Sequence, residues 1–228
     1  MPAEVKVGII DSGVSPAQAA ALVGSVAIGA VCGLAARLAP EPDSVGHGTA
    51  VAAIVLAHAP AAQLASAQAF NGARSADAAC VAEAIAWCLE QQVRVINLSL
   101  ALRADHPQLR LACRTAQARG AIVVGAHPAR GGSVYPAAYP GVLAVSGDAR
   151  CRTQEWSVIE PGRWYGTAAV AADGVTAGGA SYAAARLSAF AACFLSDSPG
   201  CGAAEFRQWL EAGAAFRGRE RRAAPEFA

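Results

Sequence analysis

The alternation of short apolar runs with longer helical patterns is the feature that most constrains the fold of this chain. The first run, residues 5–10, is rich in β-branched side chains and ends at Asp11-Ser12-Gly13, and residues 49–57 then read as a helix. Short strands separated by helices are typical of βαβ units that build a mostly parallel sheet. The pattern therefore predicts an α/β fold in which helices flank a mostly parallel sheet.

The same alternation continues along the chain. Further strands are expected at residues 63–70, 94–98, 121–124 and 142–146, and further helices at residues 75–91, 106–119, 181–195 and 203–214. Ser75 or Asp77 would cap the helix at 75–91, and Gly120 would end the next one. Residues 1–215 are expected to form a single domain, followed by a frayed, Arg-rich tail at 216–228.

The composition excludes several classes of function. The chain carries 18 basic and 17 acidic residues, for a formal net charge of +1, so nothing favours a nucleic-acid surface. No stretch offers the roughly 18 uninterrupted apolar residues that a membrane span needs. The amino terminus lacks the basic and long apolar segments of an export signal. None of the seven cysteines stands in a CxxC pair, which argues against zinc and favours reduced thiols in a cytoplasmic protein.

Three short segments each place a reactive side chain at the expected end of an element. Asp11 ends the first apolar run, His47 precedes the first helix between two glycines, and Ser181 begins an alanine-rich helix. Together they are the parts of an acyl-transfer site, because an imidazole can take the serine's proton while a carboxylate orients the imidazole. Each residue alone has a simpler interpretation as a turn or a helix cap. It is the combination that favours catalysis.

The order Asp, His, Ser along the chain is that of subtilisin. From about residue 5 to about residue 195 the chain resembles the subtilase family of serine peptidases, with residues 7–13, 46–50 and 179–183 similar to the family's aspartate, histidine and serine segments. This resemblance implies the three-layer fold of that family. It also implies that Asp11 is the orienting acid, His47 the general base and Ser181 the nucleophile.

A fourth segment resembles the substrate-binding strand of the family. Residues 95–100 read Val-Ile-Asn-Leu-Ser-Leu, and by this resemblance Ser99, Leu100 and Ala101 form an edge to which an extended peptide adds as a strand. The implied partner is therefore a peptide or protein substrate. No cofactor and no metal are expected, since no acidic loop resembles the calcium sites of the family.

The oxyanion site departs from the family pattern. Subtilases usually supply a side-chain amide as the second oxyanion donor beside the nucleophile's own N–H, and an ungapped match places Ala129 at that position. Losing one such donor typically lowers turnover about 100- to 1,000-fold. The ring N–H of His127 is a candidate substitute, although His127 can equally be a turn residue before Pro128. Arg130 is a weaker candidate.

Two functions of different classes follow. The first is a serine endopeptidase of narrow specificity that cuts a leader or propeptide from a precursor protein. In size the chain resembles the small processing peptidase of quinohemoprotein amine dehydrogenase biogenesis, and, as it starts at its first strand, no folding pro-segment is expected. The alternative is a catalytically impaired subtilase that keeps its groove as a peptide-binding or scaffolding module. The presence of Asp11, His47 and Ser181 together favours the enzyme.

Overall fold

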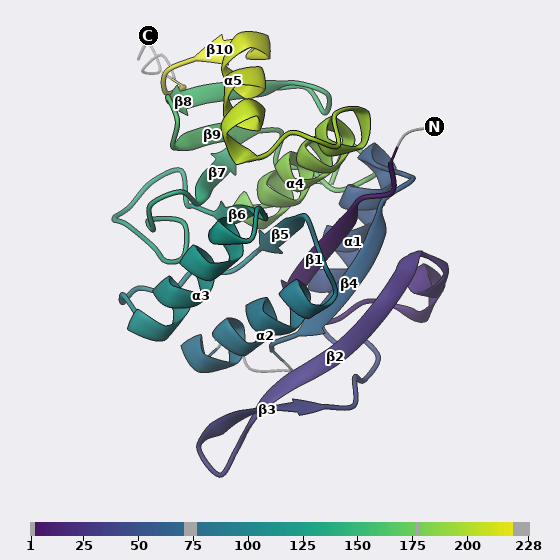
Figure 1. Ribbon diagram of the computed structural model, residues 1–228. Coiled ribbons are helices and arrows are strands. Elements are labelled where there is room, and N and C mark those ends of the chain that lie inside the picture. The colour runs from purple at the N-terminus through teal and green to yellow at the C-terminus, as the bar shows by residue number, and fades with distance from the viewer. Residues whose placement is uncertain (1–2, 71–76, 177, 221–228) are drawn as a thin grey trace, which may run out of the picture.

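A ten-stranded sheet forms the middle of the protein, of which the computed structural model describes residues 3–70, 77–176 and 178–220 (Figure 1). The strands are β1 (Lys6–Asp11), β2 (Leu22–Val31), β3 (Leu34–Leu38), β4 (Gln63–Gln68), β5 (Val95–Leu98), β6 (Ile122–Ala126), β7 (Leu143–Gly147), β8 (Trp156–Glu160), β9 (Trp164–Thr167) and β10 (Phe216–Arg217). Their order across the sheet is β10-β8-β9-β7-β6-β5-β1-β4-β2-β3. Only the β2–β3 and β8–β9 pairs of this sheet are antiparallel, so the predicted, mostly parallel sheet is confirmed.

The central strands bring their carboxyl ends to one edge of the sheet. In the parallel register, Asp11 of β1 lies opposite Gln68 of β4, and Ile10 lies opposite Leu98 of β5. The residue that follows β5, Ser99, therefore emerges at the same edge as Asp11. In open parallel sheets this edge is where binding sites form.

Helices cover both faces of the sheet (Figure 1). They are α1 (His47–His58), α2 (Ala78–Glu90), α3 (Pro107–Ala118), α4 (Ala180–Asp197) and α5 (Ala203–Gly213), with a 3₁₀ turn, η1, at Pro16–Ala21. Side chains alternate across β1, so that Val7 and Ile9 pack with α1 and α4, whereas Ile10 packs with α2 and α3. The three-layer α/β fold is thus confirmed.

Two helix ends follow the expected chemistry. Asp77 caps α2, where its Oδ1 accepts from the backbone N–H groups of Ala79 at 2.7 Å and Cys80 at 3.4 Å. Ser75, the other candidate cap, lies outside the described residues. Gly120 follows α3 with a φ of 82°, a left-handed conformation that glycine adopts without steric cost. Both boundaries agree with the sequence pattern.

The structure adds strands that the pattern missed and corrects the prediction of a frayed tail. The hairpin of β2 and β3 and the antiparallel pair of β8 and β9 widen the sheet on either side. Phe216–Arg217 pairs with β8 as strand β10, and the N–H of Gly218 bonds to the carbonyl of Val158 at 2.9 Å. The chain therefore stays attached through residue 218, because an open sheet edge offers unpaired backbone groups. Residues 221–228 lie outside the described residues.

Candidate active site

A buried carboxylate and an imidazole meet at the carboxyl edge of the sheet. Asp11 is fully buried, and its Oδ1 lies 2.7 Å from Nδ1 of His47, the first residue of α1. The same Oδ1 accepts from the backbone N–H of Ser12 at 2.7 Å. Because a carboxylate accepts this hydrogen bond, Nδ1 of His47 carries the proton and Nε2 is left as the basic nitrogen.

Glycines let the two segments that carry these side chains approach each other. A Cβ on Gly48 would lie 2.0 Å from the carbonyl oxygen of Gly13, so only glycine fits there. The N–H of Gly48 also donates to Oγ of Ser12 at 2.9 Å. The start of α1 is thereby fixed against the turn after β1, which sets the distance between His47 and Asp11.

A second carboxylate, Asp43, organises the turn before His47. Its Oδ1 accepts from the backbone N–H of Gly46 at 2.9 Å, and its Oδ2 accepts from the backbone N–H and the hydroxyl of Thr49 at 2.9 and 2.6 Å. Burial opposes ionisation of Asp43, but the hydrogen bonds from Thr49 and Gly46 outweigh it and lower the pKa of this carboxyl. Sequence reasoning missed this residue, although an Asp four residues before a helix-starting His is a recognisable turn signal.

The environment makes His47 a stronger base. Burial raises the pKa of the Asp11 carboxyl, while its hydrogen bond to His47 opposes that shift. The hydrogen bond that His47 donates to Asp11 raises the pKa of His47 against the effect of burial, and the negative charges of Asp11 and Asp43 act in the same direction. A carboxylate that stabilises the imidazolium is what a general base needs when it takes a proton from a hydroxyl.

Ser181 lies near the start of α4, which Gly179 precedes. Its Oγ donates to the carbonyl of Ser99 at 3.1 Å, and Oγ of Ser99 donates to the carbonyl of Ser181 at 3.2 Å. The amide of Asn97 in turn donates to Oγ of Ser99 at 2.8 Å and accepts from Oγ of Ser188 at 3.1 Å. This network fastens the start of the helix to the end of β5.

The proposed nucleophile is next in sequence to a residue that packs on the proposed base. The ring of Tyr182, the residue after Ser181, stacks on His47 with the ring centroids 6.2 Å apart. Within the part of the chain that the structure describes, no hydrogen bond joins Oγ of Ser181 to His47, since that hydroxyl donates to the carbonyl of Ser99. Catalytic hydrogen bonds often form only when substrate is bound. Proton transfer to His47 therefore requires Oγ to leave the Ser99 carbonyl.

A cleft of about 450 Å³ opens at Ser181. The predicted peptide edge lines it, with Ser99, Leu100 and Ala101 all contributing. Leu102, the next residue, already pairs with another segment in an antiparallel bridge. The structure thus brings the three predicted substrate-binding residues to the predicted nucleophile.

Neither Ala129 nor His127 supplies a second oxyanion donor to Ser181 in this structure. Ala129 lines the Ser181 cleft, where its methyl group can donate no hydrogen bond. His127 is not among the residues that line the Ser181 cleft. Nδ1 of His127 lies 2.7 Å from the carbonyl of Pro128, to which it donates, and its ring packs on Trp164 with centroids 4.7 Å apart. The N–H of Ser181, in the first turn of α4, is the donor that the helix start supplies.

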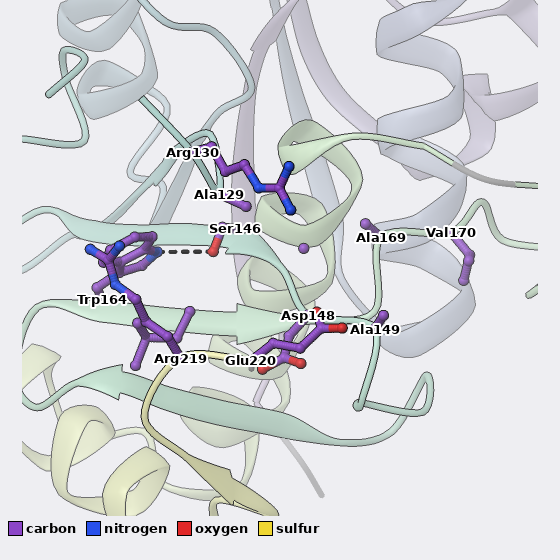
Figure 2. A pocket seen from close by; sticks show the side chains of 12 residues that line it. Ala129, Arg130, Ser146, Asp148, Ala149, Trp164, Ala169, Val170, Arg219 and Glu220 are labelled. Atoms are coloured by element: carbon purple, nitrogen blue, oxygen red, sulfur yellow. Dashed lines mark hydrogen bonds between the residues drawn. The ribbon is translucent and has the colours of Figure 1, made fainter. Parts of the chain in front are cut away.

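A larger hollow of about 1100 Å³ adjoins the cleft (Figure 2). Its lining includes Ala129, Arg130, Asp148, Ala149, Ala169 and Val170. Ala129 and Ala169 also line the Ser181 cleft, so the two spaces are adjacent. Arg130 reaches over the hollow from the loop after β6. Across from it lies Asp148, whose Oδ2 forms an ion pair with Nη2 of Arg150 at 2.7 Å. A substrate longer than the cleft has room here for its side chains.

The cysteines stand apart from this site. All seven are free thiols, and four are buried: Cys80, Cys88, Cys113 and Cys151. Burial raises the pKa of Cys88 to about 12, so this thiol stays protonated and acts as a small packing group. Among the described residues, no three His, Cys, Asp or Glu side chains gather as a metal site would require. None of the helices within those residues has the length and apolar character to span a bilayer.

Fold and site together define a class of protein. A buried carboxylate bonded to an imidazole, with a serine at a helix start on the same edge of a parallel sheet, is the arrangement of a serine hydrolase with the chain order of subtilisin. The model of the subtilase family matches residues 3–225. The chain therefore belongs to the subtilase family.

Characterised relatives show similar stretches of sequence. The thermostable alkaline protease of Halalkalibacterium halodurans is 35% identical over 130 residues, which make up 51% of this chain and 36% of that protein. Subtilisin Savinase of Lederbergia lenta is 31% identical over 155 residues, or 62% of this chain and 54% of that protein. The matched region thus spans about a third to about half of the length of these relatives.

Solved structures share the fold at lower identity. The S41 psychrophilic protease has a TM-score of 0.72 at 20% identity, covering 92% of this chain and 82% of its own. A lanthipeptide protease has a TM-score of 0.70 at 17% identity, covering 92% and 80%. The prenylagaramide maturation protease PagA has a TM-score of 0.70 at 17% identity, covering 91% and 82%. These likenesses establish the shared fold.

Proposed function

We propose that this chain is a serine endopeptidase. The observation that carries the proposal is the 2.7 Å hydrogen bond between Asp11 and His47 at the same sheet edge as the cleft lined by Ser181 and the peptide edge. Nε2 of His47 takes the proton of Ser181 while Oγ bonds to the scissile carbonyl carbon, and the resulting oxyanion meets the N–H of Ser181. The imidazolium then protonates the leaving amine as the C–N bond breaks. Water, deprotonated by His47, hydrolyses the acyl-enzyme and restores Ser181.

We further propose that the substrate is a precursor from which a leader or propeptide is removed. An alanine at position 129 lowers the expected intrinsic rate, and a slow enzyme suits a single well-bound precursor better than general digestion. Proteins of the same fold include a lanthipeptide protease and a maturation protease. A cytoplasmic location is part of the same proposal, supported by seven free thiols, and cell fractionation tests it.

Two observations favour a second candidate, a catalytically impaired subtilase that binds peptides or acts as a scaffold. Ala129 brings no amide to the cleft, and Oγ of Ser181 donates to the carbonyl of Ser99 rather than to His47. Such a module would keep the peptide edge and hold a strand without cutting it.

Cleavage of a peptide library, read by mass spectrometry, separates the two candidates. The enzyme is expected to cut a small set of related sequences, and Ser181→Ala is expected to abolish every cut while still binding the same peptides. Cleavage that persists in Ser181→Ala does not depend on Ser181 and counts against the proposal. Binding without any cleavage by the wild type supports the scaffold, and rapid cleavage of unfolded casein at many sites contradicts the narrow specificity.

A further inference from the structure

Arg186 is a buried cation behind the candidate nucleophile. It lies on α4 with no exposed surface. Its Nε donates to Nε2 of His58 at 3.1 Å. Its two terminal nitrogens donate to three backbone carbonyls of segment 168–171: Ala168, Val170 at 3.1 Å and Ala171 at 3.5 Å. Among the described residues, no carboxylate is within ion-pair distance of Arg186.

A guanidinium in such a place is costly unless its donors are satisfied. Removing a charge from water without a counter-ion is strongly unfavourable, and here carbonyl and imidazole acceptors replace the missing carboxylate. Burial lowers the pKa of His58, and the charge of Arg186 acts in the same direction, so His58 is neutral and its Nε2 can accept. A lysine cannot reproduce this contact, because a single ammonium cannot reach acceptors as widely separated as the planar fork of arginine does.

The segment that Arg186 holds is the wall of the candidate site. Ala169 lines both the Ser181 cleft and the adjoining hollow, and Val170 lines the hollow (Figure 2). The N–H of Gly178 bonds to the carbonyl of Ala169 at 2.8 Å. Gly178 stands shortly before Ser181, so the wall is tied to the start of the nucleophile helix.

The contact between Arg186 and His58 also involves α1, the helix that carries the proposed general base, His47. His58 is the last residue of α1, and His47 is the first. The ring of His58 also packs edge-on against Phe190 of α4. One buried side chain therefore joins α1, α4 and the wall of the cleft.

We propose that Arg186 is a positioning residue that holds segment 168–171 where an extended peptide must pass. It touches no substrate and acts through the carbonyls it binds. This inference rests on the proposed peptidase function. It predicts that cleavage of substrates that reach the adjoining hollow depends strongly on Arg186. The reaction of Ser181 with a small reagent that does not reach the hollow should depend on Arg186 much less.

Arg186→Lys tests the inference, with Arg94→Lys as the matched control. Arg94 also donates to two backbone carbonyls, those of Pro199 and Cys201, at the opposite ends of the strands. Arg186→Lys is expected to lower kcat/KM for an extended peptide by about 10- to 100-fold, since small displacements of a substrate-positioning wall are costly. Labelling of Ser181 by a small fluorophosphonate is expected to change much less. Arg94→Lys should leave both rates unchanged.

Hydrogen exchange gives a readout that does not depend on activity. In Arg186→Lys the amide protons of Ala171 and Gly178 are expected to exchange faster, while those of β5 stay protected. His58→Gln keeps an acceptor for Arg186 and is expected to behave as the wild type, whereas His58→Ala is expected to share the defect in milder form.

Some results overturn the inference, and another bears on the proposed function instead. Unchanged peptide cleavage and unchanged exchange in Arg186→Lys overturn it. Equal losses of labelling and peptide cleavage, or faster exchange throughout the sheet, also overturn it, because they indicate a general loss of structure. If the wild type itself is not labelled at Ser181, the proposed function fails instead, and exchange at Ala171 and Gly178 alone decides whether Arg186 holds the wall.

Discussion

Replacing Ala129 by asparagine measures how much a missing oxyanion donor limits this protein. Ala129 is exposed and lines the Ser181 cleft, so the new side chain enters open space rather than the core. One donor of this kind contributes about 100- to 1,000-fold to kcat. A second feature that lowers the expected rate is the 3.1 Å hydrogen bond from Oγ of Ser181 to the Ser99 carbonyl, which must break before Ser181 can react. A neutral bond of that kind contributes about 1 kcal/mol, or about fivefold in rate.

The missing donor is therefore the larger of the two deficits. Ala129→Asn is expected to raise kcat by about 10- to 100-fold, short of the full value because no neighbouring group is arranged to hold the new amide. Peptide hydrolysis at saturating substrate gives kcat, and thermal unfolding checks that the fold is unchanged. Ala149→Asn is the matched control, since Ala149 lines the adjoining hollow but not the Ser181 cleft. No increase in Ala129→Asn, or an equal increase in the control, refutes the reasoning.

The remaining predictions concern the base and its surroundings. The neighbouring carboxylates raise the pKa of His47, and only the neutral imidazole accepts a proton, so kcat/KM is expected to fall as the pH drops through a value above histidine's ordinary 6.5. Asp43→Asn removes one negative charge and should shift that limb of the pH profile to lower pH; an unshifted limb argues against a contribution from Asp43. Gly48→Ala drives a methyl group into the backbone of Gly13 and is expected to lower the free energy of unfolding by about 2 kcal/mol or more in chemical denaturation. Gly132→Ala, where a Cβ meets open space, should leave stability and cleavage unchanged.

Sequence patterns predicted the elements that carry the strongest local signals. The β-branched run of β1 and the glycines on either side of His47 were sufficient to place Asp11 and His47 at the same edge, and the structure brings them to 2.7 Å. Strand β2 was not predicted, because Gly24 and Gly29 interrupt its apolar pattern. Strand β10 was not predicted, because a short, charged segment forms a strand only where a neighbouring sheet edge offers backbone partners.

Side-chain partners were harder to predict than backbone elements. His127 has the right chemistry for an oxyanion donor, yet its ring bonds to the adjacent Pro128 carbonyl and packs on Trp164. The hydrogen bond from Arg186 to His58 connects residues far apart in the chain, and no spacing of residues in the sequence predicts it. Such contacts depend on how the layers pack, which a single sequence does not reveal.

The site of covalent attachment of a fluorophosphonate, mapped by mass spectrometry, tests most directly whether Asp11, His47 and Ser181 act together. The reagent is expected to modify Ser181 alone, with no labelling in Ser181→Ala. Asp11→Asn keeps the shape of the side chain but removes the charge that orients His47, and it is expected to slow labelling by about 1,000- to 10,000-fold. Attachment at another residue, or labelling of Ser181 at the same rate in Asp11→Asn, would contradict the catalytic roles proposed for these three residues.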